Sequence, residues 1–209
     1  MPPKSKKKYS SVLPKIKLGP VLGEGDQGTV YQHPLNDGLA VKILKGGVIL
    51  NQELKLHRKA MKLGITPYIH KSSKNAMIMD RITPVKFLST RREQIMLVKS
   101  LAKLVRAGIL HNDLHVGNVG VVRSKTGRVT NVVIYDFGLA REIKPPTDVV
   151  VFEQIVLAQL YAMADPCNIN NSSKNICANT SYILDMIYAI RRNEGEELKL
   201  LHRIFKTGK

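Results

Sequence analysis

Residues 111–140 constrain the fold of this chain more than any other stretch, because two polar motifs in it are joined by a hairpin pattern. The stretch opens with H-N-D-L-H-V-G-N and ends with D-F-G-L-A. Between the motifs, residues 119–123 and 129–135 are rich in β-branched side chains, and a Ser-Lys-Thr-Gly turn separates them. A hairpin brings its two ends together, so the motifs are expected to meet.

Three side chains would converge where this hairpin closes: Asp113, Asn118 and Asp136. Two carboxylates and an amide oxygen suit Mg²⁺, which prefers oxygen ligands and keeps waters and phosphate oxygens as its other ligands. This is the outline of a phosphoryl-transfer site. A lone Asp more often caps a turn, but two motifs in this order favour the site.

The pattern H-x-D-L-x-x-x-N followed by D-F-G resembles the catalytic and metal-binding loops of protein kinases. The resemblance implies that Asp113 accepts the proton of the attacking hydroxyl or orients that hydroxyl. It also implies that Asn118 and Asp136 hold Mg²⁺. His111 is interpreted as a structural histidine that braces the loop.

A glycine motif, G-x-G-x-x-G-x-V, is formed by Gly23, Gly25, Gly28 and Val30. Glycine lets a hairpin tip lie close over phosphates and present backbone N–H groups to them. A dinucleotide-binding motif would need a helix that starts inside it, whereas Thr-Val-Tyr-Gln continues here as a strand. The motif therefore favours the ATP-binding glycine loop of a kinase.

Lys42 lies in the middle of a short apolar strand pattern, L-A-V-K-I-L. The kinase resemblance implies that it reaches the α- and β-phosphates of ATP. Residues 48–63 repeat apolar positions at intervals of three and four, which predicts a helix. Glu53 on this helix is the only acidic residue between Lys42 and Asp80, so it is the local candidate for the ion pair that positions the lysine.

Residues 75–83 read as a strand followed by a connector, in the position of the hinge between kinase lobes. Met79 would then border the adenine of ATP, and Asp80 and Ile82 would offer backbone groups to the base. A Met-rich strand is also typical of plain core.

Other helices are predicted on both sides of the two polar motifs. The sequence Thr-Arg-Arg-Glu from Thr90 is a capping box, and the helix that it starts should end near Gly108. After D-F-G, helical patterns cover residues 149–164, 180–192 and 195–206.

The predicted fold class is α+β: a two-lobed protein kinase-like fold with a small antiparallel β N-lobe plus one helix and a short, mainly helical C-lobe. The N-lobe sheet should have about five strands. The expected domain organisation is a basic disordered tail over residues 1–11, the kinase N-lobe over 12–80 and a reduced C-lobe over 81–209.

Three features depart from the usual protein kinase pattern. No A-P-E follows D-F-G, position 115 is His where Ser/Thr kinases typically carry Lys, and Gly117 replaces an acidic residue. The short tail and the missing A-P-E resemble the minimal atypical kinases, such as the RIO family and the small kinase of the KEOPS complex. The loop H-x-D-L-H-x-G-N instead resembles aminoglycoside and choline phosphotransferases, which share the fold.

The preferred interpretation is an enzyme, a minimal atypical serine/threonine protein kinase that uses ATP and Mg²⁺ and at least autophosphorylates, for example at Ser10 and Ser11. The short and basic segment after D-F-G suits an acidic polypeptide better than a polycationic small molecule. Two alternatives stay open. One is a small-molecule phosphotransferase of the aminoglycoside or choline type, and the other is an ATP-binding scaffold associated with nucleic acid.

The formal net charge is +17, from 33 Lys and Arg against 16 Asp and Glu. Such an excess is typical of a protein that binds an acidic protein substrate or nucleic acid, although a solvated cationic surface explains it equally well. No apolar run approaches the ~20 residues that span a membrane, and the N-terminal residues do not form a secretory signal. A cytoplasmic or nuclear location without a membrane partner is expected.

Overall fold

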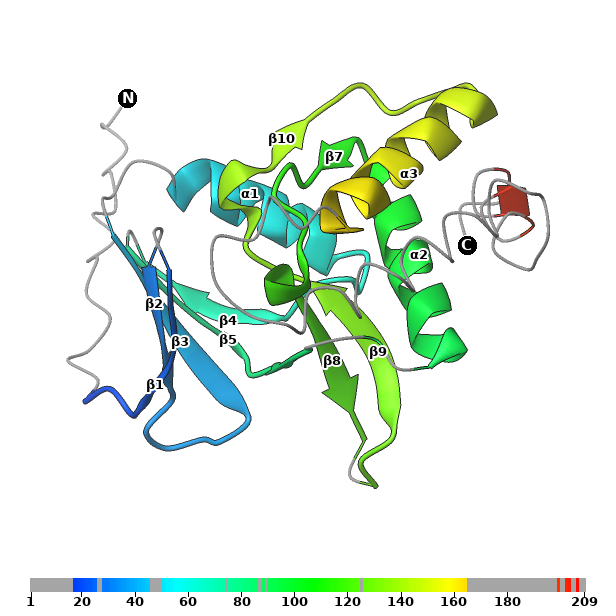
Figure 1. Cartoon of the computed structure of the whole chain (residues 1–209). Coiled ribbons are helices and arrows are strands. Elements are labelled where there is room, and N and C mark those ends of the chain that lie inside the picture. The colour runs from blue at the N-terminus through cyan, green and yellow to red at the C-terminus, as the bar shows by residue number, and fades with distance from the viewer. Residues whose placement is uncertain are drawn as a thin grey trace, which may run out of the picture. The chain divides into compact units, whose positions relative to one another are not determined.

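The computed structural model describes residues 17–25, 28–45, 50–73, 75–85, 88, 90–124, 126–164, 199, 202, 203 and 206. The chain divides into two compact units, Met1–Asn51 with Ile69–Arg81 and Gln52–Tyr68 with Ile82–Lys209 (Figure 1). The predicted basic tail and the predicted helices over 180–192 and 195–206 lie outside the described residues, apart from the four isolated positions near the end.

The first unit is built on a five-stranded antiparallel sheet with the strand order β1-β2-β3-β5-β4. Its strands are β1 (Val21–Gly25), β2 (Gly28–Gln32), β3 (Leu39–Leu44), β4 (Ile69–Ser72) and β5 (Ala76–Asp80). The turn between β2 and β3 is held by the Asn36 side chain, whose Oδ1 accepts from Gly38 N at 2.9 Å. Ala40 and Val41 of β3 and Met77 of β5 are buried.

The second unit contains the helices and two smaller sheets. The helices are α1 (Leu50–Met61), whose first two residues belong to the first unit, α2 (Arg91–Arg106) and α3 (Val149–Ala164). The strands are β6 (Thr83–Pro84), β7 (Ile109–Leu110), β8 (Val119–Arg123), β9 (Val129–Ile134) and β10 (Arg141–Glu142), and the 3₁₀ turns are η1 (Val116–Asn118) and η2 (Phe137–Leu139). The orders are β6-β8-β9 in one sheet and β10-β7 in the other.

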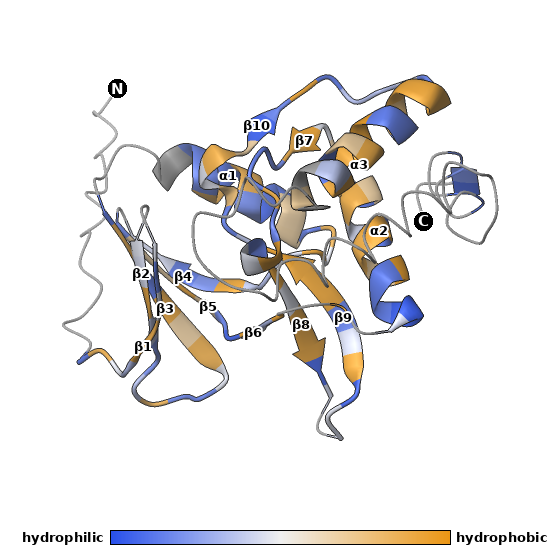
Figure 2. Ribbon diagram, in the orientation of Figure 1, coloured by the Kyte–Doolittle hydropathy of each residue, from blue (hydrophilic) through white to orange (hydrophobic). Residues whose placement is uncertain are grey.

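Helix α2 begins with the predicted capping box and buries one apolar face. Thr90 Oγ1 accepts from Glu93 N at 3.2 Å, and Glu93 Oε2 accepts from Thr90 N at 3.1 Å. Residues of α2, α3 and the β8–β9 hairpin share one hydrophobic cluster, and apolar residues predominate on β8 (Figure 2). This cluster includes Leu101, Val132 and Phe152, all fully buried.

A second cluster joins α1 to the segment around D-F-G. It contains Leu56 and Ala60 of α1, Leu104 of α2, and Phe137 and Ala140, together with Ile65 and Ile109. The core of this unit therefore reaches the candidate site.

The α+β class and the five-stranded antiparallel sheet are confirmed, as are the helix over α1, the hairpin over β8 and β9, and the helix over residues 149–164. The short strands β6, β7 and β10 were not predicted, because two residues are too few to show a strand period. Within the part of the chain that the structure describes, no helix combines the length and apolarity needed to cross a membrane.

Candidate functional site

The glycine motif forms the β1–β2 hairpin of the first unit. Gly23 pairs with Val30, and Gly25 pairs with Gly28 at the end of the ladder. A Cβ on Gly28 would stand 2.3 Å from Ile43 O, whereas no described atom lies within 4 Å of that position at Gly23 or Gly25. The third glycine therefore permits the close approach of β3, and the first two leave the backbone accessible to a ligand.

An ion pair that the sequence analysis missed joins this hairpin to the end of β3. Glu24 Oε1 lies 2.7 Å from Lys45 Nζ. The hydrogen bond from Lys45, and then its positive charge, lower the pKa of Glu24. The two residues are 21 positions apart, and no spacing rule predicts a pair at that distance.

Lys42 lies in β3, opposite Val30 in β2 and Met77 in β5. Its side chain is only 7% exposed, so it is not an ordinary solvated strand lysine. Burial of an ammonium group requires compensating polar contacts. In the second unit Glu53 of α1 is 1% exposed. The ion pair between Lys42 and Glu53 stays a prediction.

The residues expected to border adenine lie at the end of β5 and beyond it. Met79 is buried, and Asp80 Oδ1 lies 2.7 Å from His70 Nε2 of β4. Ile82 belongs to the second unit, where its Cδ1 is 2.9 Å from the position that a Cβ on Gly120 would take. The structure places these residues on ordered backbone, and their contact with a base stays a prediction.

Asp113 and Asn118 are joined directly in the loop before β8. Asn118 donates from Nδ2 to Asp113 O at 2.8 Å and to Asp113 Oδ2 at 3.3 Å. The backbone carbonyl oxygen of Asp113 can only accept a hydrogen bond, so the side-chain amide nitrogen of Asn118 must face Asp113. The Oδ1 of Asn118 is therefore the atom of this side chain that is suited to coordinate a metal ion.

Asp136 directly follows Tyr135, whose backbone is bonded to this loop. Tyr135 N donates to Asn118 O at 3.0 Å, which extends the β8–β9 ladder beyond the pair Val119 and Ile134. Asp136 has φ 64° and ψ 72°, a left-handed conformation that is uncommon for a residue with a side chain. Burial, assisted by the charge of Asp136, raises the pKa of Tyr135 to about 12.

The hairpin thus brings Asp113, Asn118 and Asp136 to one of its ends, as its pattern predicted. An amide oxygen and a carboxylate form a donor set that fits Mg²⁺, which takes few protein ligands and fills its sphere with phosphate oxygens and water. Among the described residues, no group of three or more His, Cys, Asp or Glu could hold a metal ion.

His111 is a buried residue that stabilises the loop before β8, as predicted. It is fully buried, its N donates to Gln159 Oε1 at 3.0 Å, and its Nε2 lies 2.9 Å from Tyr135 O. Because a carbonyl oxygen only accepts, Nε2 carries the proton. Burial lowers the pKa of His111, outweighing the hydrogen bond that the ring donates to Tyr135 O, which raises it. The imidazole is therefore a neutral structural group.

The phenylalanine of D-F-G packs between two histidine rings. The ring centre of Phe137 lies 5.2 Å from that of His111 and 5.6 Å from that of His57 in α1. His57 is itself held by Pro67 O, 2.8 Å from its Nε2, and by Thr66 Oγ1. The helical repeat of residues 48–63 places His57 on a helix but does not predict this contact.

His115 and Gly117 fit together in the loop, which explains two of the departures from the kinase pattern. Gly117 N donates to His115 Nδ1 at 3.0 Å, so in the neutral ring the proton is on Nε2. That Nε2 lies 3.9 Å from Asp113 Oδ2. A Cβ on Gly117 would stand 2.7 Å from His115 Cε1. Glycine at 117 is therefore what allows the imidazole to point toward Asp113.

A comparison with protein families finds one match. The profile described as ABC1 atypical kinase-like domain matches residues 51–163, more than half of the chain. The matched region contains Glu53, Asp113, Asn118 and Asp136, and it begins after the glycine hairpin and Lys42.

Proposed function

Because the chain belongs to the ABC1 atypical kinase-like domain family, we propose that it transfers the terminal phosphoryl group of ATP to Ser or Thr hydroxyls of proteins, including its own. ATP-dependent phosphoryl transfer is the general chemistry of a kinase-like domain. The choice of a protein acceptor also draws on the resemblance to the RIO family and to the small kinase of the KEOPS complex, and belongs to the proposal.

One observation carries the proposal, namely the contact of Asp113 with Asn118 at the hairpin end from which Asp136 emerges. Asp113 orients the acceptor hydroxyl and takes its proton. The oxygen then bonds to the γ-phosphorus while the bond to the bridging oxygen breaks, and ADP leaves with that electron pair.

Asn118, through Oδ1, and Asp136 would hold Mg²⁺, which neutralises charge on the phosphate oxygens when it is bound. Catalysis of this kind depends on position and charge more than on covalent chemistry by the protein. The two hydrogen bonds from Asn118 to Asp113 keep the base and the metal ligand in a fixed relation.

The nucleotide-binding residues in this proposal are those of the first unit, with two additions from the second. The β1–β2 hairpin covers the phosphates with Gly23, Gly25, Gly28 and Val30. Lys42 pairs with the phosphates, and Glu53 positions Lys42. Met79, Asp80 and Ile82 border the base. The burial of both Lys42 and Glu53 supports these roles, because buried charges are kept where they are paired or functional.

The acceptor is proposed to be an acidic polypeptide because of the charge of the chain. Near its end, the described residues Lys199, Arg203 and Lys206 are exposed and basic. An aminoglycoside is a polycation and would need carboxylates instead. A small-molecule acceptor is the second candidate, favoured by the His115 and Gly117 arrangement of the H-x-D-L-H-x-G-N loop.

The experiment that tests the proposal is incubation of the purified protein with labelled ATP and Mg²⁺, alone and with an acidic, casein-like protein. We expect label on Ser or Thr. We expect Asp113→Asn to lower the rate by about 10²–10⁴, the usual effect of a positioned base. Asp136→Ala should abolish metal-dependent turnover, and Asp37→Asn, at an exposed carboxylate in the β2–β3 turn, should leave it unchanged.

Two results would contradict the proposal. Full turnover in Asp136→Ala would exclude the metal assignment. Rapid ATP consumption with an amino alcohol or a sugar, without label on any protein, would replace the protein acceptor with a small molecule.

A further inference from the structure

In the segment that follows D-F-G, residues 140–143 are held by backbone hydrogen bonds. Arg141 and Glu142 of β10 pair with Leu110 and Ile109 of β7. Just beyond β10, Ile143 N donates to Gly108 O at 2.9 Å. The part of the segment around β10 is therefore fixed by backbone pairing and is not an open loop.

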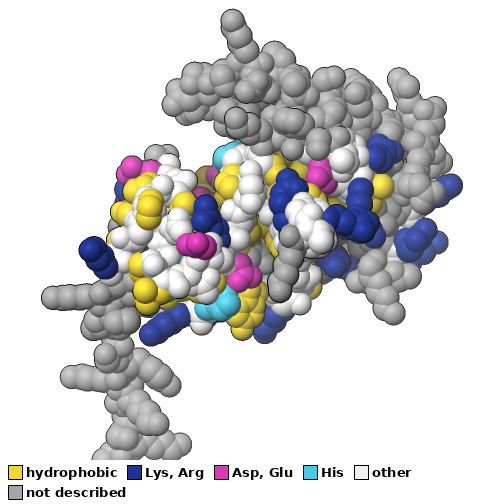
Figure 3. All heavy atoms as spheres, turned by 90° about the horizontal axis from the view of Figure 1, so that it is seen from below, with side chains coloured by type: hydrophobic (Ala, Val, Ile, Leu, Met, Phe, Trp, Pro, Cys, Tyr) yellow, Lys and Arg dark blue, Asp and Glu magenta, His cyan; other side chains and the backbone are white. Residues whose placement is uncertain are grey.

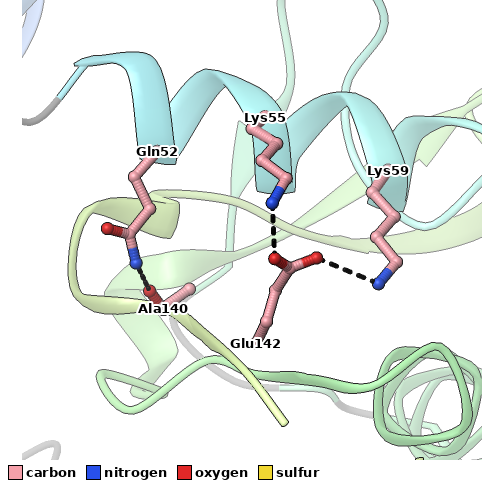
Figure 4. A network of polar contacts seen from close by, with 5 residues as sticks. All are labelled: Gln52, Lys55, Lys59, Ala140 and Glu142. Atoms are coloured by element: carbon pink, nitrogen blue, oxygen red, sulfur yellow. Dashed lines mark hydrogen bonds and ion pairs between the residues drawn. The ribbon is translucent and has the colours of Figure 1, made fainter. Parts of the chain in front are cut away.

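Side chains from one face of helix α1 contact the same segment (Figure 4). Gln52 Nε2 donates to Ala140 O at 3.3 Å. Lys55 Nζ lies 2.5 Å from Glu142 Oε2, and Lys59 Nζ lies 3.3 Å from Glu142 Oε1. The three helix residues are spaced by three and four positions, so they line one face of α1.

Each oxygen of the Glu142 carboxylate has its own lysine partner. The hydrogen bonds from Lys55 and Lys59 lower the pKa of Glu142. One exposed ion pair contributes little to stability, but two cations that converge on one anion form a small network.

The buried face of α1 contacts D-F-G itself. Leu56 and Ala60 share a hydrophobic cluster with Phe137 and Ala140, and the His57 ring packs against the Phe137 ring. Helix α1 also carries the buried Glu53. The position of this helix and the position of D-F-G are therefore coupled through two sets of contacts, one apolar and one ionic.

No residue in this segment can be phosphorylated on a hydroxyl. The chain reads D-F-G-L-A-R-E-I-K-P-P from Asp136, and the first Ser, Thr or Tyr is Thr147. In many kinases a phosphate added to this segment orders it by pairing with basic side chains. Here the carboxylate of Glu142 already pairs with two lysines of α1.

We propose that Glu142 is a positioning residue that fixes α1 and D-F-G in their working arrangement without phosphorylation. This inference rests on the proposed function. Glu142 acts through α1 and does not touch the reacting atoms.

The test compares four proteins: the wild type, Glu142→Gln, Glu142→Lys, and the charge reversal that combines Glu142→Lys with Lys55→Glu and Lys59→Glu. The ion pairs of Glu142 with Lys55 and Lys59 are called the tether below. Amide hydrogen exchange of residues 50–61 and 139–143, measured without nucleotide, reports on the tether. The values of kcat and KM for ATP report on its effect on the reaction. Asp37→Asn is the control for loss of an exposed carboxylate outside the network.

We expect Glu142→Gln to speed exchange in both segments and to lower kcat by about fivefold with little change in KM, because exposed ion pairs each make only a small contribution. Glu142→Lys should have a larger effect, because it places three cations together. The charge reversal should restore both measurements toward those of the wild type, which a loss of general folding stability would not do.

Unchanged exchange in both single variants would overturn the tether. Faster exchange with an unchanged kcat would overturn the positioning role. If the wild-type protein transfers no phosphate, the proposed function fails, and the positioning role with it, while the exchange rates still decide whether the tether exists.

Discussion

At the scale of single residues, the loop before β8 depends on a glycine that no catalytic rule requires. Gly117 leaves room for the His115 ring and donates the hydrogen bond that sets its tautomer. We expect Gly117→Ala to displace His115 and to lower kcat by about fivefold, since a hydrogen bond contributes ~1 kcal/mol. Steady-state kinetics with labelled ATP measures this.

A double-mutant cycle separates this mechanism from general damage to the loop. If Gly117→Ala acts through the imidazole, the same change should cost nothing further in a His115→Ala background. Additive losses of activity would show that Gly117 acts independently of His115.

The lowered pKa of His111 predicts how the free energy of unfolding depends on pH. Burial lowers its pKa in the folded protein below the ~6.5 of an unfolded chain. Below that pH the unfolded state binds the additional proton, so the free energy of unfolding should fall as pH falls, by at most about 1.4 kcal/mol per pH unit.

Urea denaturation between pH 7.5 and 5.5 tests this prediction. His111→Gln should be less stable than the wild type at pH 7.5 but should show a shallower dependence on pH. His33→Gln, in the connection after β2, serves as the matched histidine control. An unchanged slope in His111→Gln would assign the dependence to other groups.

At the scale of elements, the start of α2 is determined by residues that lie close together in the sequence. Its capping box is made by Thr90 and Glu93, and the helix then packs against the β8–β9 hairpin, which begins directly after Asn118 and leads to Asp136. We expect Thr90→Ala to cost about 1 kcal/mol of unfolding free energy, the usual loss at an N-cap. Thr90→Ser keeps the oxygen and should cost much less. Equal losses in both variants, measured by urea denaturation, would contradict the capping role.

At the scale of the whole molecule, the charge excess is visible on the surface. Lys and Arg side chains are exposed on the face drawn in Figure 3. Helix α2 and the β8–β9 hairpin carry the exposed residues Arg91, Arg92, Lys99, Arg106, Arg123 and Arg128. Their only acidic residue, Glu93, is buried in the capping box.

If this surface binds nucleic acid, affinity should fall steeply with salt, with a log–log slope of several units. Lys99→Gln should reduce the slope by about one unit, and Lys17→Gln, in the first unit, is the control. Fluorescence anisotropy with labelled RNA and DNA across a salt series measures both. A flat salt response would remove nucleic acid from the expected partners and leave an acidic protein.

The sequence by itself determined the features that depend on neighbouring residues. The β-branched runs and the turn between them predicted the hairpin that unites Asp113, Asn118 and Asp136. The capping box and the spacing of apolar residues predicted α2 and α3. Such features are readable because hydrogen bonding and burial repeat with the short period of a helix or strand.

Only the tertiary structure decided which distant side chains meet. With 33 Lys and Arg and 16 Asp and Glu, many ion pairs are compatible with the sequence, and no period favours Glu142 with Lys55 and Lys59, which lie more than 80 positions away. The packing of Phe137 between His57 and His111 has the same origin. These contacts exist because burial of Leu56, Ala60 and Phe137 in one core brings α1 against the segment after D-F-G, and the polar pairs form where that packing places them.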